Sequence, residues 1–194
     1  DLVALGNTGA YAADRWRGYR NTGGGFVARV AGSRQARALR IGRNDGTTAA
    51  AAIGLCHVVD GEAARRLRGK PVTFTADFSR GGGWSPPGGT VIVRIYTNTS
   101  AAAAFGTASL PAGSVQLVTD SVVPGTTPAT VSFSTGAATI PADAELVIVY
   151  LQAAGFTGTA AADWFQIEAP RLCPGTQPCD YVELAETQER ERCE

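Results

Sequence analysis

The residues in this chain that are best suited to chemistry are aromatic side chains beside hydrogen-bonding groups. Trp84 lies between the three glycines at residues 81–83 and the segment Ser85-Pro86-Pro87. Glycines let a ligand approach the backbone, prolines limit the freedom of the loop, and an exposed indole can stack on the apolar face of a sugar ring. Trp84 is therefore a candidate binding residue. The alternative is that it caps the end of a hydrophobic core.

Two predicted strands, residues 90–97 and 161–169, carry a second set of candidates. In each strand, polar and aromatic side chains alternate with apolar ones, and alternate residues of a strand share a face. If both strands belong to one sheet, these side chains form a surface of aromatic plates flanked by hydrogen-bonding groups, as a sugar cleft requires. The alternative is that this face packs inside an oligomer. The members of the set are Arg94, Tyr96, Trp164, Gln166 and Glu168.

Nucleophilic and acid–base chemistry find little support. The chain has no Gly-x-Ser-x-Gly and no Gly-x-x-x-x-Gly-Lys-Ser/Thr motif. The single histidine, His57, directly follows Cys56 in a predicted strand, so the two side chains point to opposite faces and do not form a catalytic pair. Cys56 is predicted to be a buried thiol. Carboxylate pairs such as Asp77 with Glu168 exist, but their spacing selects none for glycoside cleavage. We expect no catalytic residues.

The cysteines favour a cross-link over a metal site. Cys173 and Cys179 bracket a five-residue loop that can close as a disulfide, and free thiols are the alternative. A zinc site is not expected, because the chain has one histidine and lacks closely spaced cysteine pairs.

Composition excludes two classes of partner. The 17 Lys and Arg residues balance the 17 Asp and Glu residues, so the chain lacks the basic field of a nucleic-acid binder. No apolar run approaches the roughly 18 residues needed to cross a bilayer, so we expect no membrane insertion. The chain contains no Met, and we expect further residues before Asp1.

Short strand-like runs separated by turn residues predict an all-β fold. A length of 194 residues suits one domain, and the 24 Gly and 10 Pro residues favour turns. Without a long amphipathic helix before residue 180, the pattern predicts a two-sheet antiparallel β-sandwich, most simply a jelly roll. The nine predicted strands are residues 26–31, 36–43, 53–59, 71–78, 90–97, 115–123, 129–134, 145–152 and 161–169.

Three segments have no predicted strand. Residues 1–21 are predicted to be an irregular lead-in, and residues 61–68 to hold one helical turn. Residues 181–194 contain no Gly or Pro and predict a short, mostly polar C-terminal helix, either solvated or packed on another subunit. We therefore divide the chain into a sandwich domain, residues 1–180, and a helical tail, residues 181–194.

Several short motifs occur in an order that resembles the carbohydrate-binding-module-like jelly-roll domains of phage tail fibre and head spike proteins, including gene-transfer-agent spikes. The opening motif is Tyr11-Ala12-Ala13-Asp14-Arg15-Trp16, and an approximate second one is Leu67-Arg68-Gly69-Lys70-Pro71-Val72-Thr73-Phe74. A later strand motif is Phe165-Gln166-Ile167-Glu168, followed by a degenerate tail with Tyr181-Val182-Glu183, Leu184 and Cys193. The Tyr-Tyr end of the family and its first strand, expected near residues 1–7, are absent or altered.

The resemblance implies a non-enzymatic fibre or spike domain that binds host capsular or envelope polysaccharide for particle attachment. It implies a place on the surface of a virion, extracellular after release, with other virion proteins as neighbours and a homo-oligomeric state. One alternative is a structural or decoration domain that links virion parts without binding sugar. A less favoured alternative is a capsule depolymerase module.

The resemblance also implies a possible structural calcium ion, since jelly-roll sugar modules often hold one near their terminal strands. Asp163 lies in a similar place, and Asp1, Asn7 and Asp77 are further oxygen donors. No other cofactor is expected.

Overall fold

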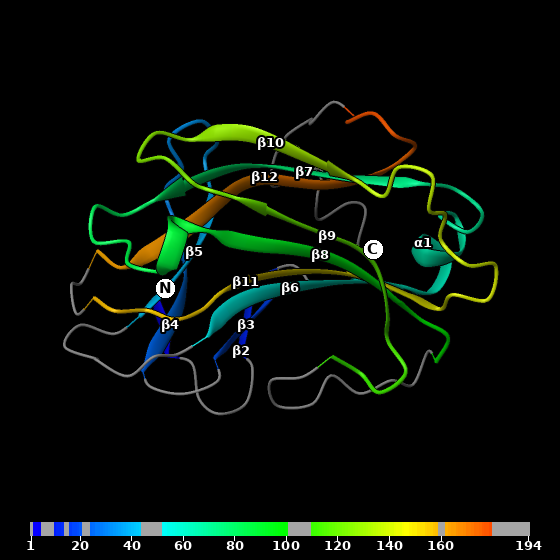
Figure 1. Cartoon of the computed structure of the whole chain (residues 1–194), viewed down its shortest axis with the longest axis horizontal. Helices are drawn as coiled ribbons and strands as arrows, with labels where there is room; N and C mark the ends of the chain where they lie inside the picture. Colours follow the sequence, from blue (N-terminus) through cyan, green and yellow to red (C-terminus); the bar gives the residue numbers. More distant parts are fainter. Residues whose placement is uncertain are drawn as a thin grey trace.

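The computed structural model of the chain describes residues 2–4, 10–13, 16–20, 24–43, 52–100, 110–158 and 162–179. These residues form two antiparallel six-stranded sheets packed face to face (Figure 1). Sheet A contains, in spatial order, β1 (Leu2–Ala4), β4 (Gly25–Val30), β5 (Ala38–Arg43), β12 (Trp164–Pro174), β7 (Val72–Arg80) and β10 (Ala129–Ser134). Sheet B contains β2 (Ala10–Ala13), β3 (Trp16–Arg20), β6 (Ile53–Asp60), β11 (Leu146–Ala153), β8 (Val91–Asn98) and β9 (Val115–Val122).

This architecture confirms the predicted all-β jelly-roll sandwich. In Figure 1, β10, β7 and β12 of sheet A lie above β9, β8, β11 and β6 of sheet B. Two short helices complete the described part, α1 (Gly61–Arg65) and the 3₁₀ turn η1 (Pro87–Gly89). The predicted helix over residues 181–194, and with it the predicted domain boundary, lies outside the described residues.

Each of the nine predicted strands is present, and the prediction of an irregular lead-in is wrong. The segment assigned to the lead-in contains β1, β2 and β3, which pair with β4 and β6 at the edges of the two sheets. The reason for the error is that these strands are only three to five residues long. A strand of that length carries too few alternations to stand out in the sequence, and tertiary pairing decides its conformation.

The core between the sheets follows the alternation of the strands. In β7, Val72, Phe74, Ala76 and Phe78 are at most 1% exposed and belong to the main hydrophobic cluster. Trp16 packs on Phe74, with ring centroids 6.5 Å apart, and is itself buried. Trp16 of the opening motif is therefore a core residue, while its motif neighbours Asp14 and Arg15 lie outside the described residues.

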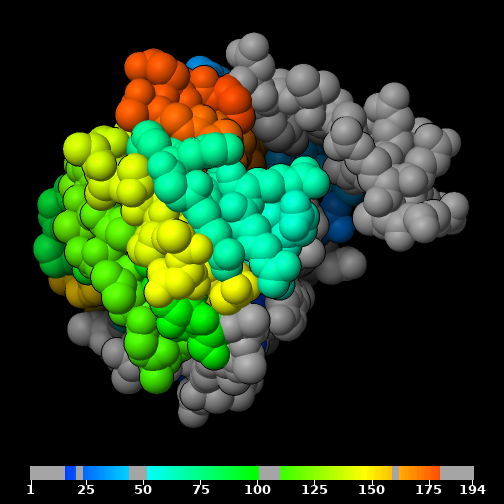
Figure 2. Space-filling view, turned by 90° about the vertical axis from the view of Figure 1, so that its right-hand side faces the viewer, coloured from blue at the N-terminus to red at the C-terminus, as the bar shows by residue number. Residues whose placement is uncertain are grey.

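The last strand is longer than predicted because it continues through a β-bulge. The register of β12 against β7 shifts between Glu168 and Arg171, and Ala169 adopts φ 46°, in the left-handed region. A bulge bends a strand without ending it. The strand therefore extends to Pro174 at the end of the sandwich that carries α1, where Figure 2 shows it in orange beside the cyan helical segment.

Candidate functional site

The five predicted face residues do not share a sheet. β8, which carries Arg94 and Tyr96, pairs with β11 and β9 in sheet B. β12, which carries the other three, pairs with β5 and β7 in sheet A. The prediction of a single face is therefore wrong: the alternation within each strand is as predicted, but the two halves lie on opposite outer surfaces of the sandwich.

The half on sheet B belongs to a cluster of tyrosines. Tyr150 stands opposite Arg94 in the register of β11 with β8, and Tyr96 lies edge-to-face with Tyr150, ring centroids 6.1 Å apart. Tyr19, from β3, stacks on Tyr150 with centroids 4.7 Å apart. The Arg94 guanidinium donates to the side-chain oxygen of Gln152 at 2.8 Å. We call this surface the tyrosine face, and its members are Tyr19, Arg94, Tyr96, Tyr150 and Gln152.

A glycine allows the tyrosines to meet. Tyr19 stands opposite Gly54 on β6, and its hydroxyl donates to the carbonyl of Leu151 at 3.2 Å. A Cβ at Gly54 would lie 2.2 Å from the Tyr19 hydroxyl oxygen and 2.1 Å from the Leu151 carbonyl oxygen. Real atoms do not approach this closely, so only glycine lets the Tyr19 phenol cross the sheet here.

Burial keeps the phenols protonated. It raises the pKa of Tyr19 well above its ordinary value and raises the pKa of Tyr150 to about 12. The hydroxyls therefore remain neutral donors and acceptors across the physiological range. Tyr19 is buried, whereas Tyr96, Tyr150, Arg94 and Gln152 are half-buried and available to a ligand.

Tyr19, Tyr150 and Gln152 are the site residues that the sequence prediction missed. The signal for two of them is the alternation in residues 146–153. Val147, Val149 and Leu151 face the core, so Tyr150 and Gln152 share the opposite face. The alternation within one strand does not predict that β11 pairs with β8, which brings Tyr150 and Gln152 next to Arg94 and Tyr96.

Cys56 and His57 are placed as predicted and form no pair. Cys56 is 5% exposed and belongs to the outer cluster of sheet B, whereas His57 packs against Trp16 of the main core, with ring centroids 4.9 Å apart. Burial raises the pKa of the Cys56 thiol to about 11. A thiol with so high a pKa is a poor nucleophile, because the thiolate is the reactive form.

On sheet A, Glu168 is the centre of a hydrogen-bonded network. Its carboxylate is fully buried and accepts from the backbone N–H groups of Ser33, Arg34 and Gln35 at 3.0, 2.9 and 3.1 Å. Burial alone would raise the pKa of Glu168, but these hydrogen bonds together outweigh it and hold the pKa below its ordinary value. Glu168 therefore anchors the segment after β4.

The remaining predicted residues of sheet A belong to the same network. The Arg40 guanidinium lies over the Trp164 ring, 3.7 Å from its centroid, and donates to the side-chain oxygen of Gln166 at 3.1 and 2.9 Å. Gln166 in turn donates to Glu168 at 3.0 Å. One face of the Trp164 indole is thus already occupied by Arg40, and the polar groups satisfy one another. This surface is built for stability rather than for a sugar.

Asp77 stands opposite Glu168 in the sheet register, yet the pair is not arranged for glycoside cleavage. Asp77 accepts from Thr130 and lies 3.5 Å from Arg34. A glycosidase acid needs a raised pKa and access to the sugar, whereas Glu168 has a lowered pKa and no exposed surface.

Trp84 caps the core, so its prediction as a stacking platform is wrong. The indole is 7% exposed and packs edge-to-face on Phe156 and Phe165, with centroids 5.5 and 5.7 Å away. Its N–H donates to the carbonyl of Gly89 at 2.8 Å. The surrounding Gly and Pro residues fold the loop back over the sandwich, which gives the indole the apolar neighbours that the local sequence lacks.

Asp163 does not fit the predicted calcium site. Its two carboxylate oxygens accept from the backbone N–H and the hydroxyl of Ser85, at 3.0 and 2.6 Å. The buried Arg43 guanidinium lies 3.8 Å away and balances the charge. Asp77 lies on the outer face of sheet A, and Asp1 and Asn7 lie outside the described residues. Within the described ranges, no group of three or more His, Cys, Asp or Glu residues could hold a metal.

The structure joins Cys173 and Cys179 in a disulfide. Of the two predicted alternatives, a disulfide or two free thiols, the structure therefore has the disulfide. The same end of β12 is fixed by Gly175, whose N–H donates to the carbonyl of Pro71 at 2.7 Å. The disulfide closes a small loop at the end of the sandwich and is remote from the tyrosine face in sequence and sheet.

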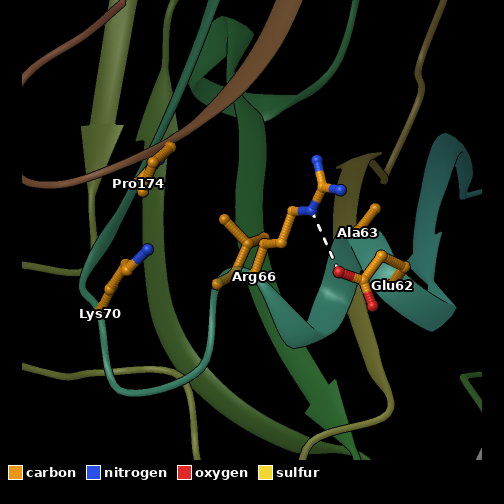
Figure 3. A pocket seen from close by; sticks show the side chains of 6 residues that line it. Glu62, Ala63, Arg66, Lys70 and Pro174 are labelled. Atoms are coloured by element: carbon orange, nitrogen blue, oxygen red, sulfur yellow. Dashed lines mark hydrogen bonds and ion pairs between the residues drawn. The ribbon is translucent and has the colours of Figure 1, made fainter.

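A shallow, open hollow of about 640 Å³ lies beside α1 (Figure 3). Figure 3 shows Arg66 paired with Glu62 on the helix, at 3.2 Å, while Lys70 and Pro174 line the other side. The two charged partners are 76% and 70% exposed, so the pair is well solvated and weak. With no aromatic ring among its lining residues, the hollow is a poorer ligand site than the tyrosine face.

No protein-family model matches the chain, and no curated protein sequence matches it. Solved structures do match its fold. The family 11 carbohydrate-binding module from Clostridium thermocellum, in complex with a β-1,3-1,4-mixed-linked tetrasaccharide, has 12% identity and a TM-score of 0.54. That match covers 90% of this chain and 96% of the neighbour.

Two family 22 modules are similar as well. A xylan-binding domain has 16% identity and a TM-score of 0.52, over 87% of this chain and 92% of the neighbour. The C-terminal module of Clostridium thermocellum Xyn10B has 17% identity and a TM-score of 0.51, over 86% and 91%. At this level of identity, the likeness establishes the jelly-roll fold of carbohydrate-binding modules. Among the described residues, neither helix has the length and apolar character to cross a membrane.

Proposed function

We propose that this chain is a non-catalytic domain that binds polysaccharide through the tyrosine face. The observation that carries the proposal is the convergence of Tyr96, Tyr150, Arg94 and Gln152, half-buried, on the outer surface of one sheet. Rings supply flat apolar surface for the C–H groups of a sugar, and neighbouring hydrogen-bonding groups fix its orientation. The fold that the chain shares with carbohydrate-binding modules supports the same conclusion.

The biological setting that we propose is host attachment by a phage-like particle, as a fibre or head-spike domain that contacts capsular or envelope polysaccharide. The support is the resemblance in residues 11–16, 67–74 and 165–168. Several copies of the domain in a homo-oligomer would convert weak single sites into firm attachment. Other virion proteins would hold the domain at the particle surface.

Catalysis is not part of the proposal. The tyrosine face contains no carboxylate among its members, and on sheet A the opposed carboxylates Asp77 and Glu168 are committed to structural hydrogen bonds. Binding without cleavage therefore agrees best with the chemistry of both outer faces.

The test measures binding of the purified protein to bacterial capsular polysaccharide by isothermal titration calorimetry and affinity electrophoresis. Tyr96→Ala removes one stacking ring and is expected to weaken binding about tenfold, a change of about 1.4 kcal/mol. Two aromatic variants serve as controls: Trp164→Phe changes the ring on the opposite sheet, and Trp84→Phe changes the buried cap. Both should bind as the unaltered protein does, although Trp84→Phe should unfold more easily.

Three results would contradict the proposal. Loss of affinity in Trp164→Phe with normal binding in Tyr96→Ala would move the site to sheet A. A folded sample that binds none of the polysaccharides would favour a purely structural domain. A decrease in polymer length during incubation would identify an enzyme.

A further inference from the structure

Two arginines lie in the same row as the centre of the tyrosine face. In the sheet register, Arg17, Cys56, Tyr150 and Arg94 form one row across β3, β6, β11 and β8. Side chains in such a row point to the same side of an antiparallel sheet. Two guanidinium groups therefore flank the Cys56–Tyr150 pair on the surface that we propose for sugar binding.

The described carboxylates on the outer face of sheet B are remote from Tyr150 and Arg94. Among the described side chains on the outer face of sheet B, the one carboxylate is Asp60, at the end of β6. Asp60 stands opposite Leu146, four residues along β11 from Tyr150, or about 13 Å at the rise of a strand. Asp120 on β9 stands opposite Val93, whose side chain faces the core, so it does not belong to the outer face.

Like Arg40, which donates to Gln166 on sheet A, Arg94 has a neutral side-chain partner rather than a carboxylate. Arg34, Arg43 and Arg68 each lie within 3.8 Å of a carboxylate oxygen. The partner of Arg94 is the neutral amide oxygen of Gln152, which occupies one of its terminal nitrogens. A guanidinium carries five N–H donors, and none of the nitrogens of Arg94 is both buried and unpaired. The rest of its donor edge therefore reaches solvent beside Tyr150.

This arrangement is suited to a planar anion. A partly desolvated cation gains most from an opposite charge, and the guanidinium fork matches the two oxygens of a carboxylate or the oxygens of a sulfate. Gln152 fixes the fork in place, so less side-chain entropy is lost when an anion binds.

We infer that the tyrosine face binds an anionic polysaccharide, with Arg94 contacting the acidic group of a sugar that stacks on Tyr150 or Tyr96. This inference rests on the proposed function and names the class of its ligand. The acidic group is a uronic-acid carboxylate or a sulfate ester, which present the same chemistry to Arg94.

The experiment compares matched pairs of polymers. One pair is a bacterial capsular polysaccharide that contains uronic acid and its carboxyl-reduced product; the other is a sulfated galactan and its desulfated product. We expect saturable binding to at least one anionic member and a loss of at least tenfold for its neutral product. The polymer pair that shows this loss identifies the acidic group as a uronic-acid carboxylate or a sulfate ester. Raising the salt from about 0.05 to about 0.5 M should weaken binding severalfold, because salt screens exposed ion pairs.

Two variants separate charge from stacking. Arg94→Gln removes the charge but keeps a hydrogen-bonding side chain, and it should lose about tenfold on the anionic polymer and clearly less on the neutral product. Arg94→Lys keeps the charge without the fork and should lose less than Arg94→Gln. Arg29 is exposed and lies on β4 of sheet A, so Arg29→Gln is the matched control and should not alter binding.

The outcomes distinguish the two proposals. Equal binding to anionic and neutral members, weakened by Tyr96→Ala but not by Arg94→Gln, would overturn the anionic ligand and leave polysaccharide binding in place. Binding to no member of either pair would contradict both.

Discussion

Glu168 is a fully buried carboxylate stabilised by backbone amides rather than by a cation. Its oxygens accept from three consecutive N–H groups, of residues 33–35, and from the Ser33 hydroxyl at 3.0 Å. Such a cradle of amides offsets the cost of removing a charge from water. It also explains why Gly32 precedes it, since a Cβ there would lie 2.6 Å from a Glu168 oxygen.

The lowered pKa of Glu168 makes stability depend on pH in a defined direction. A carboxylate whose pKa is lower in the folded state contributes stability above its unfolded pKa, about 4.3, and loses that contribution as the pH falls through the folded value. Glu168→Gln places an amide N–H₂ against backbone donors and should lower the free energy of unfolding on the order of 3 kcal/mol at neutral pH. The gap between the two proteins should narrow as the pH falls below about 4.3, where the unfolded chain begins to bind a proton at Glu168, and should close as the pH falls through the lower folded pKa.

Urea unfolding at several pH values measures this gap. The exposed Glu62→Gln is the control, and its effect should stay within about 0.5 kcal/mol. A gap for Glu168→Gln that is the same at neutral and acidic pH would show that the charge of Glu168 does not stabilise the fold.

At the scale of the element, the tyrosine face depends on how β3 pairs with β6. Gly54 is the one point where the Tyr19 ring can lie across the neighbouring strand and reach Leu151 and Tyr150. The stack of Tyr19 on Tyr150 then supports the ring that faces the ligand.

Gly54→Ala should therefore disturb this element. The added Cβ would meet the Tyr19 hydroxyl and the Leu151 carbonyl, so Tyr19 must leave its position. We expect a loss of about 1–3 kcal/mol in unfolding free energy, from overpacking, and a change in the near-ultraviolet circular dichroism of the tyrosines. Gly82→Ala, where a Cβ would meet nothing within 4 Å, is the matched control. An unchanged tyrosine signal in Gly54→Ala would show that the glycine does not position Tyr19.

The elements were largely predictable, and the site was not. Alternation in residues 72–78 or 146–153 reports which side chains share a face, because it is a property of one strand. Whether Tyr96 lies near Tyr150 or near Trp164 depends on strand order, which is set by long-range pairing that no single segment encodes. Trp84 shows the same limit, since its apolar neighbours Phe156 and Phe165 lie about 70 and 80 residues away in sequence.

At the scale of the whole molecule, one sandwich carries two outer faces with different chemistry. On sheet A, polar side chains satisfy one another, as in the chain of contacts from Arg40 through Gln166 to Glu168. On sheet B, rings and an arginine remain half-buried and accessible. The hydrophobic core lies between them, and packed sheets are about 10 Å apart, so the two outer faces do not share contacts.

This separation predicts that stability and binding can be changed independently. Gln166→Ala breaks the network on sheet A and should lower the unfolding free energy by about 1–3 kcal/mol, because Arg40 and Glu168 lose a buried partner, while leaving polysaccharide affinity unchanged. Tyr150→Ala removes the central ring of the tyrosine face and should weaken binding at least tenfold.

The double variant tests whether the two faces are independent. The changes in unfolding free energy that Gln166→Ala and Tyr150→Ala cause singly should add within about 0.5 kcal/mol, and the affinity should equal that of Tyr150→Ala alone. Urea unfolding and titration calorimetry on all four proteins measure both quantities. A coupling above about 1 kcal/mol between the two changes in unfolding free energy would mean that the two faces communicate through the core. Weaker binding in Gln166→Ala would mean that the network on sheet A also positions the ligand site.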